Sequence, residues 1–250
     1  MTKNELKFYS SLLQKKFRTE EKKFLVEGIK LIREAILSDF KCERIFFTSS
    51  FYEKYSDEIK YFEKLKIPFE QIHKKELEKL SDVKSPQEII AVIHYKEKQQ
   101  ANFNSKFIVA LENINDPGNF GTIIRNCDWF GIDNIIASDD CAEIFSPKVI
   151  RASAGSVFHL NIFEEKEFCI SLKNYKSMGY KLYCSDLDGK NISEVKSNSK
   201  IIIALSNEAN GPTNELLKLS DEIITIPKKG RAESLNVANA SAVILYEMTK

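Results

Sequence analysis

The sequence has no long apolar run, and this absence argues against a helix that crosses a membrane. Such a helix needs roughly 18 consecutive apolar residues, whereas the longest core-like run here extends only from Ile201 to Leu205. The first ten residues also lack the apolar segment of a secretory signal. The chain has 5 cysteines, without a CxxC pair, and this pattern favours reduced thiols. We therefore expect a cytoplasmic protein with no membrane contact.

Histidine and glycine are also scarce, and their placement excludes several kinds of site. The 3 histidines are scattered and unpaired with nearby thiols, so no metal site is predicted. None of the 9 glycines forms a GxG pair, and no GxxxxGK[ST] occurs, which excludes a dinucleotide-binding loop and a P-loop. The segment from Gly118 to Gly121 reads GxxG, the backbone clamp of KH modules. It follows a predicted buried strand and opens a helix, which is the wrong context for that module.

An excess of charge of either sign is missing from the chain as a whole, because 37 Lys and Arg face 36 Asp and Glu. The two halves nevertheless differ, with a net charge of +4 in residues 1–104 and −3 in residues 105–250. Residues 1–23 alone carry +4 and include Phe8, Tyr9 and Phe17. A basic segment interleaved with aromatic residues suits phosphate contacts and base stacking in RNA. The alternative interpretation is a solvated amphipathic helix.

Alternating helix and strand patterns predict two α/β domains, at 1–95 and 106–250, joined by a polar linker at 96–105. The apolar, β-branched strands of the second domain are typical of a mainly parallel sheet covered on both faces. In the first domain, strands are expected at 24–26, 44–48, 67–72 and 89–94, and helices at 4–16, 28–38, 50–66 and 74–80. In the second, strands are expected at 107–111, 134–137, 180–184, 201–205 and 223–226, and helices at 119–130, 147–152, 165–178, 212–219 and 235–248.

Three polar segments, 115–125, 205–212 and 226–237, each follow a predicted strand of the second domain. In open α/β sheets, ligands bind at this carboxyl edge. Structural interpretations of their polar residues are also open. Arg125 could pair with Asp128, Glu208 could be a helix cap before Pro212, and Ser234 could be the N-cap of the last helix.

Taken together and in this order, the three segments resemble the motifs of the SpoU/TrmH branch of the SPOUT RNA methyltransferases. DPGNFGTIIR is similar to the first motif, LSNEANGP to the second and IPKKGRAESLNVANASAVILYE to the third. FSPKVIRASAGSVFHL resembles the intermediate stretch of the family, and SPQEIIAVI the end of its substrate domain. Three departures stand out. Glu88 and Ser206 occupy positions where the family usually has Gly, and Lys228 replaces an apolar residue.

The resemblance implies an α/β fold with a ribosomal-protein-like substrate domain and a C-terminal SPOUT domain that contains a trefoil knot. It implies S-adenosylmethionine as the cofactor and a homodimer whose active site combines both subunits. It also implies RNA as the partner, with ribosomal RNA favoured over transfer RNA. No membrane and no metal enter this interpretation.

Carried over by position, the resemblance assigns two groups of residues, and the distribution of charge indicates a third. The catalytic set is Arg125, Asn119, Glu208, Ser234 and Asn236. The cofactor-binding set is Leu205, Ser206, Gly211, Ile226, Leu235 and Asn236. The RNA-binding set, chosen from the basic N-terminal segment and from local positive charge in the second domain, is Lys15, Lys16, Arg18, Lys22, Lys148, Arg151, Lys228 and Arg231.

The expected reaction is in-line attack of a ribose 2′-hydroxyl on the sulfonium methyl group. A guanidinium keeps its proton at neutral pH, so we favour Arg125 as a group that grips the adjacent phosphate and stabilises developing negative charge. A deprotonated Arg125 acting as the base is the competing version. Two other functions stay open at this point: a catalytically silent RNA-binding or ribosome-assembly protein with this fold, and a base methyltransferase.

Overall fold

The computed structural model describes residues 1–96, 105–195 and 200–250. The chain divides into two compact units, one comprising Met1–Gln99 and Phe145–Phe158, the other Gln100–Ile144 and His159–Lys250. Residues 145–158, which the sequence places inside the second domain, therefore pack with the first unit. The expected linker at 96–105 falls almost entirely outside the described residues.

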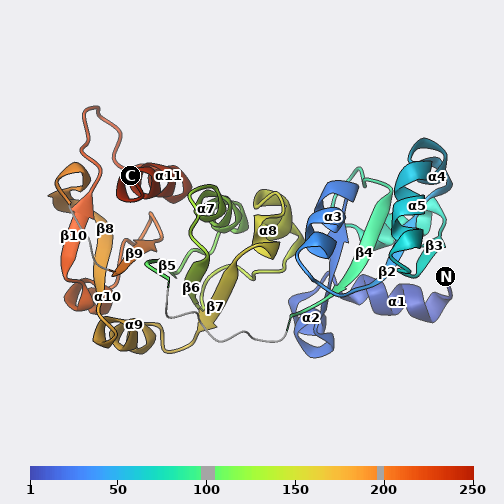
Figure 1. The fold of residues 1–250 in the computed structure, drawn as a ribbon, viewed down its shortest axis with the longest axis horizontal. Coiled ribbons are helices and arrows are strands. Elements are labelled where there is room, and N and C mark those ends of the chain that lie inside the picture. The colour runs from blue at the N-terminus through green and yellow to red at the C-terminus, as the bar shows by residue number, and fades with distance from the viewer. Residues whose placement is uncertain (97–104, 196–199) are drawn as a thin grey trace. The chain divides into compact units, whose positions relative to one another are not determined.

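The first unit is built on a four-stranded mixed sheet in the order β1-β4-β2-β3. β4 pairs antiparallel with both β1 and β2, and β3 lies parallel to β2 at the edge. The strands and helices alternate along the chain, and Figure 1 shows them in blue to green. The elements are α1 (Lys3–Ser11), α2 (Lys15–Glu21), β1 (Lys23–Glu27), α3 (Ile29–Leu37), β2 (Cys42–Phe47), α4 (Ser49–Lys54), α5 (Ser56–Lys64), β3 (Phe69–Gln71), α6 (Lys74–Leu77), η1 (Glu78–Leu80) and β4 (Ile89–His94), joined by α8 (Pro147–Ala152) and η2 (Ser156–Phe158).

Two helices of the first unit are shorter than the sequence predicts, because each expected helix is divided. The helix expected at 4–16 ends at Ser11, and α2 begins at Lys15. The helix expected at 50–66 is interrupted at Tyr55, whose φ of −129° and ψ of 45° lie outside the helical region. Apolar periodicity continues across both breaks, so it gives no sign of them.

Segment 145–158 completes the aromatic core of the first unit. The ring of Phe145 stacks on that of Phe24, with the centroids 4.4 Å apart, and the ring of Phe158 meets the edge of Phe40 at 5.2 Å. Phe24 and Phe158 are almost fully buried. Phe24 and Phe40 of the first unit are therefore buried in part by this segment.

The second unit is built on a six-stranded, all-parallel sheet in the order β10-β8-β9-β5-β6-β7. This confirms the α/β class and the parallel sheet expected from the apolar strands. β7 lies in a stretch where no strand was predicted. The elements are β5 (Phe107–Glu112), α7 (Pro117–Trp129), β6 (Asn134–Ser138), β7 (Asn161–Glu165), α9 (Phe168–Ser177), β8 (Tyr180–Asn191), η3 (Ile192–Glu194), β9 (Lys200–Ser206), α10 (Asn214–Leu219), β10 (Glu222–Thr225) and α11 (Val237–Met248).

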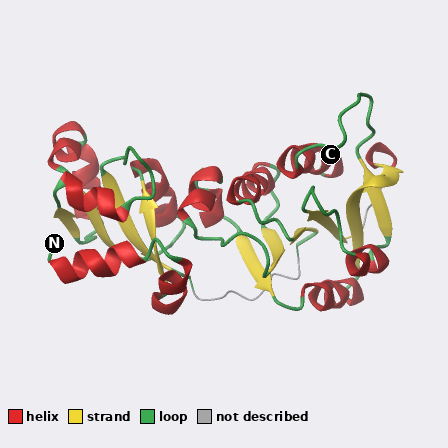
Figure 2. Cartoon of the chain, turned by 180° about the vertical axis from the view of Figure 1, so that it is seen from behind, coloured by secondary structure: helices red, strands yellow, loops and turns green. Residues whose placement is uncertain are grey.

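Helices cover both faces of this sheet. Figure 1 shows α7 and α11 side by side on one face and α9 and α10 on the other, and Figure 2 shows the same layers from behind. Central strands β5 and β9 are buried along almost their whole length, as expected for strands between two helical layers. No helix in the described part of the chain has the length and apolar character needed to cross a membrane.

An irregularity in β8 shapes the carboxyl edge of the sheet. Ile223 of β10 pairs with Cys184, but the next residue, Ile224, pairs with Lys190, so the residues between Cys184 and Lys190 bulge out of the ladder. Gly189 lies where a Cβ atom would come within 2.9 Å of the β10 backbone, which explains the glycine. The bulge brings Leu187 to the edge where the candidate site is found.

Candidate functional site

A cavity of about 560 Å³ lies at the carboxyl edge of the parallel sheet. Its wall is formed by the bulge of β8, by the ends of β9 and β10 with the segments that follow them, and by the beginning of α11. This is the edge at which ligands bind open α/β sheets. Among the predicted cofactor residues, those that line the cavity are Leu205, Ser206, Gly211, Ile226 and Leu235.

Three side chains from the three predicted segments meet beside this cavity. The Asn119 amide nitrogen donates to Glu208 Oε1 at 3.0 Å. The Asn236 amide nitrogen lies 3.0 Å from Asn119 Oδ1 and 3.3 Å from the same Glu208 oxygen. Asn119 and Asn236 thus form one hydrogen-bonded cluster with Glu208, although they lie 89 and 28 positions from it in the chain.

Helix caps fix the orientation of this cluster. Asp116 caps α7 by accepting the Asn119 backbone N–H at 2.8 Å. Asn236 caps α11 through its Oδ1 atom, which accepts the backbone N–H groups of Ala238 at 3.0 Å and Asn239 at 3.4 Å. Because the oxygen of Asn236 is held by the helix, its NH₂ group must face Glu208 and Asn119.

Two structural interpretations from the sequence are wrong. The N-cap of α11 is Asn236 and not Ser234, which instead lines the cavity. Helix α10 begins at Asn214 with Thr213 as its cap, so Pro212 is not the first helical residue.

Arg125 lies on the exposed surface of α7 and is not among the residues that line the cavity. The suggested pairing of Arg125 with Asp128 is not found. Asp128 instead accepts or shares a hydrogen bond with His159 Nδ1 at 2.8 Å. The Arg125 side chain is exposed, and no described residue forms an ion pair with its guanidinium.

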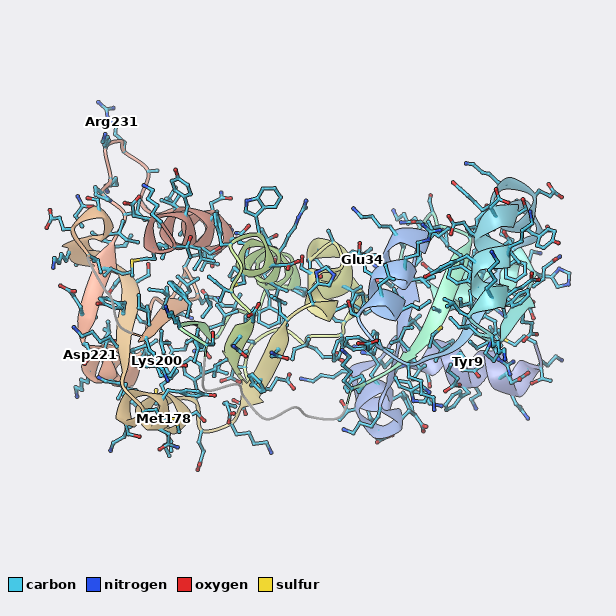
Figure 3. All side chains as sticks on the ribbon, in the orientation of Figure 1. Tyr9, Glu34, Met178, Lys200, Asp221 and Arg231 are labelled. Atoms are coloured by element: carbon cyan, nitrogen blue, oxygen red, sulfur yellow. The ribbon has the colours of Figure 1, made fainter. Side chains whose placement is uncertain are left out.

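The predicted RNA-binding residues differ in exposure and in their contacts within the protein. Arg18 is only 3% exposed, and its guanidinium donates to the Leu12 carbonyl at 2.7 Å, so it holds the break between α1 and α2 and is not available to RNA. Arg151 is engaged in a two-pronged ion pair with Asp82, at 2.6 and 2.8 Å. Figure 3 shows Arg231 at the tip of the loop that protrudes between β10 and α11. The other predicted residues with exposed side chains are Lys15, Lys16, Lys22, Lys148 and Lys228.

A buried carboxylate that the sequence analysis missed lies directly behind the cavity wall. Glu112, the last residue of β5, is 4% exposed and accepts the Ser206 hydroxyl at 3.1 Å. It also accepts the backbone N–H of Thr213 at 2.9 Å and the Thr213 hydroxyl at 2.6 Å. A lone acidic residue at the end of a buried strand, just before a polar segment, was the available signal.

Ser206, one of the departures from the family pattern, fits its position without backbone strain. It ends β9 and does not have a positive φ. Its hydroxyl donates to Glu112. Glu88, the other residue found where Gly is usual, does have a positive φ of 59°.

Thiol and metal chemistry receive no support from the described residues. The five cysteines form no disulfide, and burial raises the pKa of the Cys184 thiol, just before the bulge in β8, to about 12. Such a thiol is a poor nucleophile at neutral pH. Within the described ranges, no group of three or more His, Cys, Asp or Glu side chains is placed to hold a metal ion.

Known proteins resemble this chain over both of its units. The model of the SpoU rRNA Methylase family matches residues 106–246, and that of the MRM3-like substrate binding domain matches residues 3–91. The 23S rRNA (guanosine(2553)-2′-O)-methyltransferase RlmP of Bacillus subtilis is 29% identical over 247 residues, which cover 98% of this chain and 95% of the relative.

Two solved structures with bound AdoMet (S-adenosylmethionine) have the same fold as this chain. The SpoU methyltransferase AviRb from Streptomyces viridochromogenes aligns with a TM-score of 0.87 at 25% identity, covering 99% of this chain and 97% of that one. An rRNA methyltransferase from Sinorhizobium meliloti aligns with a TM-score of 0.82 at 25% identity, covering 99% and 94%.

Proposed function

The chain belongs to the SpoU rRNA methylase family, and we propose that it transfers the methyl group of S-adenosylmethionine to a ribose 2′-hydroxyl of ribosomal RNA. The observation that carries the proposal is the convergence of Asn119, Glu208 and Asn236 beside a cavity at the carboxyl edge of the sheet. The similarity to a 23S rRNA 2′-O-methyltransferase along nearly the whole chain supports the ribose and the ribosomal RNA as the target.

The cavity fits the cofactor in size and in lining. Its volume of about 560 Å³ lies within the range of small-molecule sites, roughly 300–1,000 Å³. Leu205, Ile226 and Leu235 give it apolar walls, and Ser206 and Gly211 also line it. When bound, S-adenosylmethionine supplies a methyl group activated by the positive charge on sulfur. An apolar, water-poor wall favours the loss of that charge during transfer.

The side chains on the RNA side position the attacking hydroxyl. Arg125 projects from α7 without an ion pair among the described residues, so its guanidinium is available to a phosphate. A guanidinium stays protonated at neutral pH, and this suits it to a two-pronged grip on phosphate and to stabilising negative charge on the ribose oxygen. Glu208 and Asn236 hold the loop that borders the cofactor, and Ser234 lies on the cavity wall.

We propose a homodimer, because Arg125 and the cavity are separated within one chain. Arg125 lies six residues beyond Asn119 on α7, which corresponds to about 9 Å along the helix axis. The paired helices α7 and α11 also expose large apolar side chains, with Trp129 83% exposed and Tyr246 57% exposed. We propose that a second copy covers this surface and that Arg125 of one chain completes the cavity of the other.

The interface can be tested by substituting Trp129→Glu. The charged side chain should shift the protein from dimer to monomer in light scattering and abolish methyl transfer, while the fold stays intact by circular dichroism. The matched control is Met178→Glu. Met178 is exposed and caps the C-terminal end of α9, on the other face of the sheet, so this variant should remain dimeric. A monomeric wild-type protein with full activity would contradict the proposal.

The first unit is proposed to bind the RNA through exposed lysines of α2 and its end, Lys15, Lys16 and Lys22. The match of this unit to the MRM3-like substrate binding domain supports this role. Lys228 and Arg231 lie on the loop near the cavity and are proposed as further phosphate contacts. The proposal includes the trefoil knot of the C-terminal loops and a cytoplasmic location.

The activity is tested by transfer of a labelled methyl group from S-adenosylmethionine to ribosomal RNA, with Arg125→Ala as the control. The product is digested to nucleosides, and mass spectrometry assigns the methyl group to ribose or base. We expect a 2′-O-methylnucleoside from ribosomal RNA and none from the Arg125→Ala protein. A base mark, a preference for transfer RNA, or RNA binding without any transfer would each contradict the proposal in a distinguishable way.

A further inference from the structure

Glu112 lies behind the cavity wall and joins both ends of the loop that forms this wall. The loop runs from Ser206, at the end of β9, to Thr213, at the cap of α10. One carboxylate oxygen of Glu112 accepts the Ser206 hydroxyl and the Thr213 backbone N–H, and the other accepts the Thr213 hydroxyl. The carboxylate does not itself line the cavity, whereas every residue from Asn207 to Pro212 does.

The loop between these two attachment points has little regular structure to hold it. Its internal hydrogen bonds are the Gly211 backbone N–H to the Asn207 carbonyl and the Ala209 backbone N–H to Asn207 Oδ1, both at 2.8 Å. Asn207 also reaches the Asn113 carbonyl at 3.3 Å, next to Glu112 in the chain. Apart from the contacts of Glu208 with Asn119 and Asn236, the position of the loop therefore depends on its anchorage to the end of β5.

The three hydrogen bonds from Ser206 and Thr213 to Glu112, which we call the clasp, satisfy a buried carboxylate. A buried carboxylate is stable only when its oxygens receive hydrogen bonds, and Glu112 receives three, which is the pattern of a satisfied buried charge. Because all three donors belong to the two ends of one loop, removal of the negative charge should release that loop before it disturbs the central sheet.

We propose that Glu112 is a positioning residue for the cofactor cavity. Acting through Ser206 and Thr213, it fixes the loop that carries Glu208 to the edge of the sheet. The cavity is therefore preformed before the ligand arrives, and its affinity depends on this clasp. The inference rests on the proposed function only in naming S-adenosylmethionine as the ligand.

The first unit contains a matched control for this clasp. Glu27 ends β1 as Glu112 ends β5, and its buried carboxylate also accepts a serine hydroxyl and a backbone N–H, from Ser81 at 2.6 Å and Gln87 at 2.8 Å. Glu27→Gln thus removes an equivalent charge from an equivalent strand end in the other unit. Any effect of general destabilisation should appear in both variants.

The test compares wild type, Glu112→Gln, Ser206→Ala, the double variant and Glu27→Gln. Ser206→Ala is included because it removes one donor from the clasp without adding volume or charge. Two measurements are made on each protein, well below its melting temperature. One is the Kd for S-adenosylmethionine by calorimetry, together with the kcat and KM of methyl transfer. The other is amide hydrogen exchange in the peptide that covers 207–212, which needs no ligand.

We expect Glu112→Gln to raise the Kd and the cofactor KM about tenfold and to change kcat much less, because charged hydrogen bonds hold the loop. Ser206→Ala should raise the Kd by about threefold, and the double variant should bind about as poorly as Glu112→Gln alone. Exchange at 207–212 should accelerate in Glu112→Gln but not in Glu27→Gln, which should keep the wild-type Kd.

Unchanged exchange at 207–212 in Glu112→Gln would overturn the inference, as would a loss of affinity in Glu27→Gln equal to that in Glu112→Gln. If wild type binds no S-adenosylmethionine, the proposed function fails, and hydrogen exchange alone still decides whether Glu112 holds the loop. The two failures are therefore distinguishable.

Discussion

A composite active site makes a sharp prediction for mixed dimers. If Arg125 of one copy completes the cavity of the other, two different inactive variants should restore activity when they are combined. The first variant is Arg125→Ala, which leaves its own cavity intact. The second is Leu235→Glu, which places a carboxylate on the apolar cavity wall and leaves its own Arg125 intact.

The expected magnitudes follow from the geometry. Arg125 lies about 9 Å along α7 from the Asn119 cluster and is absent from the cavity wall, so in the proposed dimer each site needs the Arg125 of the other chain. The Arg125→Ala homodimer should lose about 100-fold or more in kcat, as is typical when an electrostatic stabiliser is removed. The Leu235→Glu homodimer should be inactive because the carboxylate blocks cofactor binding in its cavity. In a purified mixed dimer, one site has both an intact cavity and an Arg125 from the other chain, and the second site has neither. The mixed dimer should therefore regain about half of the wild-type activity.

The assay uses two affinity tags to isolate mixed dimers and measures methyl transfer to ribosomal RNA. The reciprocal control combines wild type with a chain that carries both substitutions. In that dimer, the intact cavity faces a partner without Arg125, so it should be inactive. An active reciprocal dimer and an inactive Arg125→Ala/Leu235→Glu dimer would show that Arg125 serves the cavity of its own chain, and would refute the reasoning.

Three further predictions concern stability and reactivity. Glu88→Gly should stabilise the protein by about 1 kcal/mol, because Glu88 has a φ of 59° that costs a non-glycine residue energy; a lower urea midpoint would contradict this. Burial favours a higher pKa for Glu43, but the hydrogen bond and charge of Lys23 outweigh it and hold the pKa below its usual value. The stability that Glu43 contributes is therefore present above about pH 4.3 and lost as the pH falls further, so wild type and Glu43→Gln should converge in urea unfolding between neutral and acid pH. Burial raises the pKa of both Cys42 and Cys184 to about 12, so these thiols should react with Ellman's reagent at pH 8 only after unfolding, and rapid labelling of either in the native protein would argue against their burial.

Most of the second sheet could be predicted from the sequence because its strands are buried on both faces. Runs such as Ile201–Leu205 are apolar at every position, which leaves no helical alternative of sufficient length. β7, at Asn161–Glu165, is an edge strand, and its side chains are only partly buried. Its composition therefore resembles a loop, and no apolar pattern could reveal it. The division between α4 and α5 at Tyr55 was hidden for the opposite reason, because apolar residues continue through it.

The candidate site could be predicted as a set of segments but not as a set of contacts. The segments were found because polar residues follow buried strands, and the resemblance supplied their order. Whether an arginine contacts RNA or the protein's own backbone depends on the local fold, as Arg18 shows. It belongs to the most basic stretch of the chain, yet α1 ends at Ser11 and leaves the Leu12 carbonyl to be satisfied from inside. Glu112 escaped notice because its donors lie about a hundred positions away.

The geometry around Glu208 also limits what this residue can do. Its Oε1 atom receives amide N–H groups from both Asn119 and Asn236, which lie at the beginnings of α7 and α11. These two donors fill the two lone pairs of this oxygen, which leaves Oε1 no further acceptor position for a ribose hydroxyl. Because Glu208 accepts from both of the other segments at once, it is suited to joining the three segments beside the cavity.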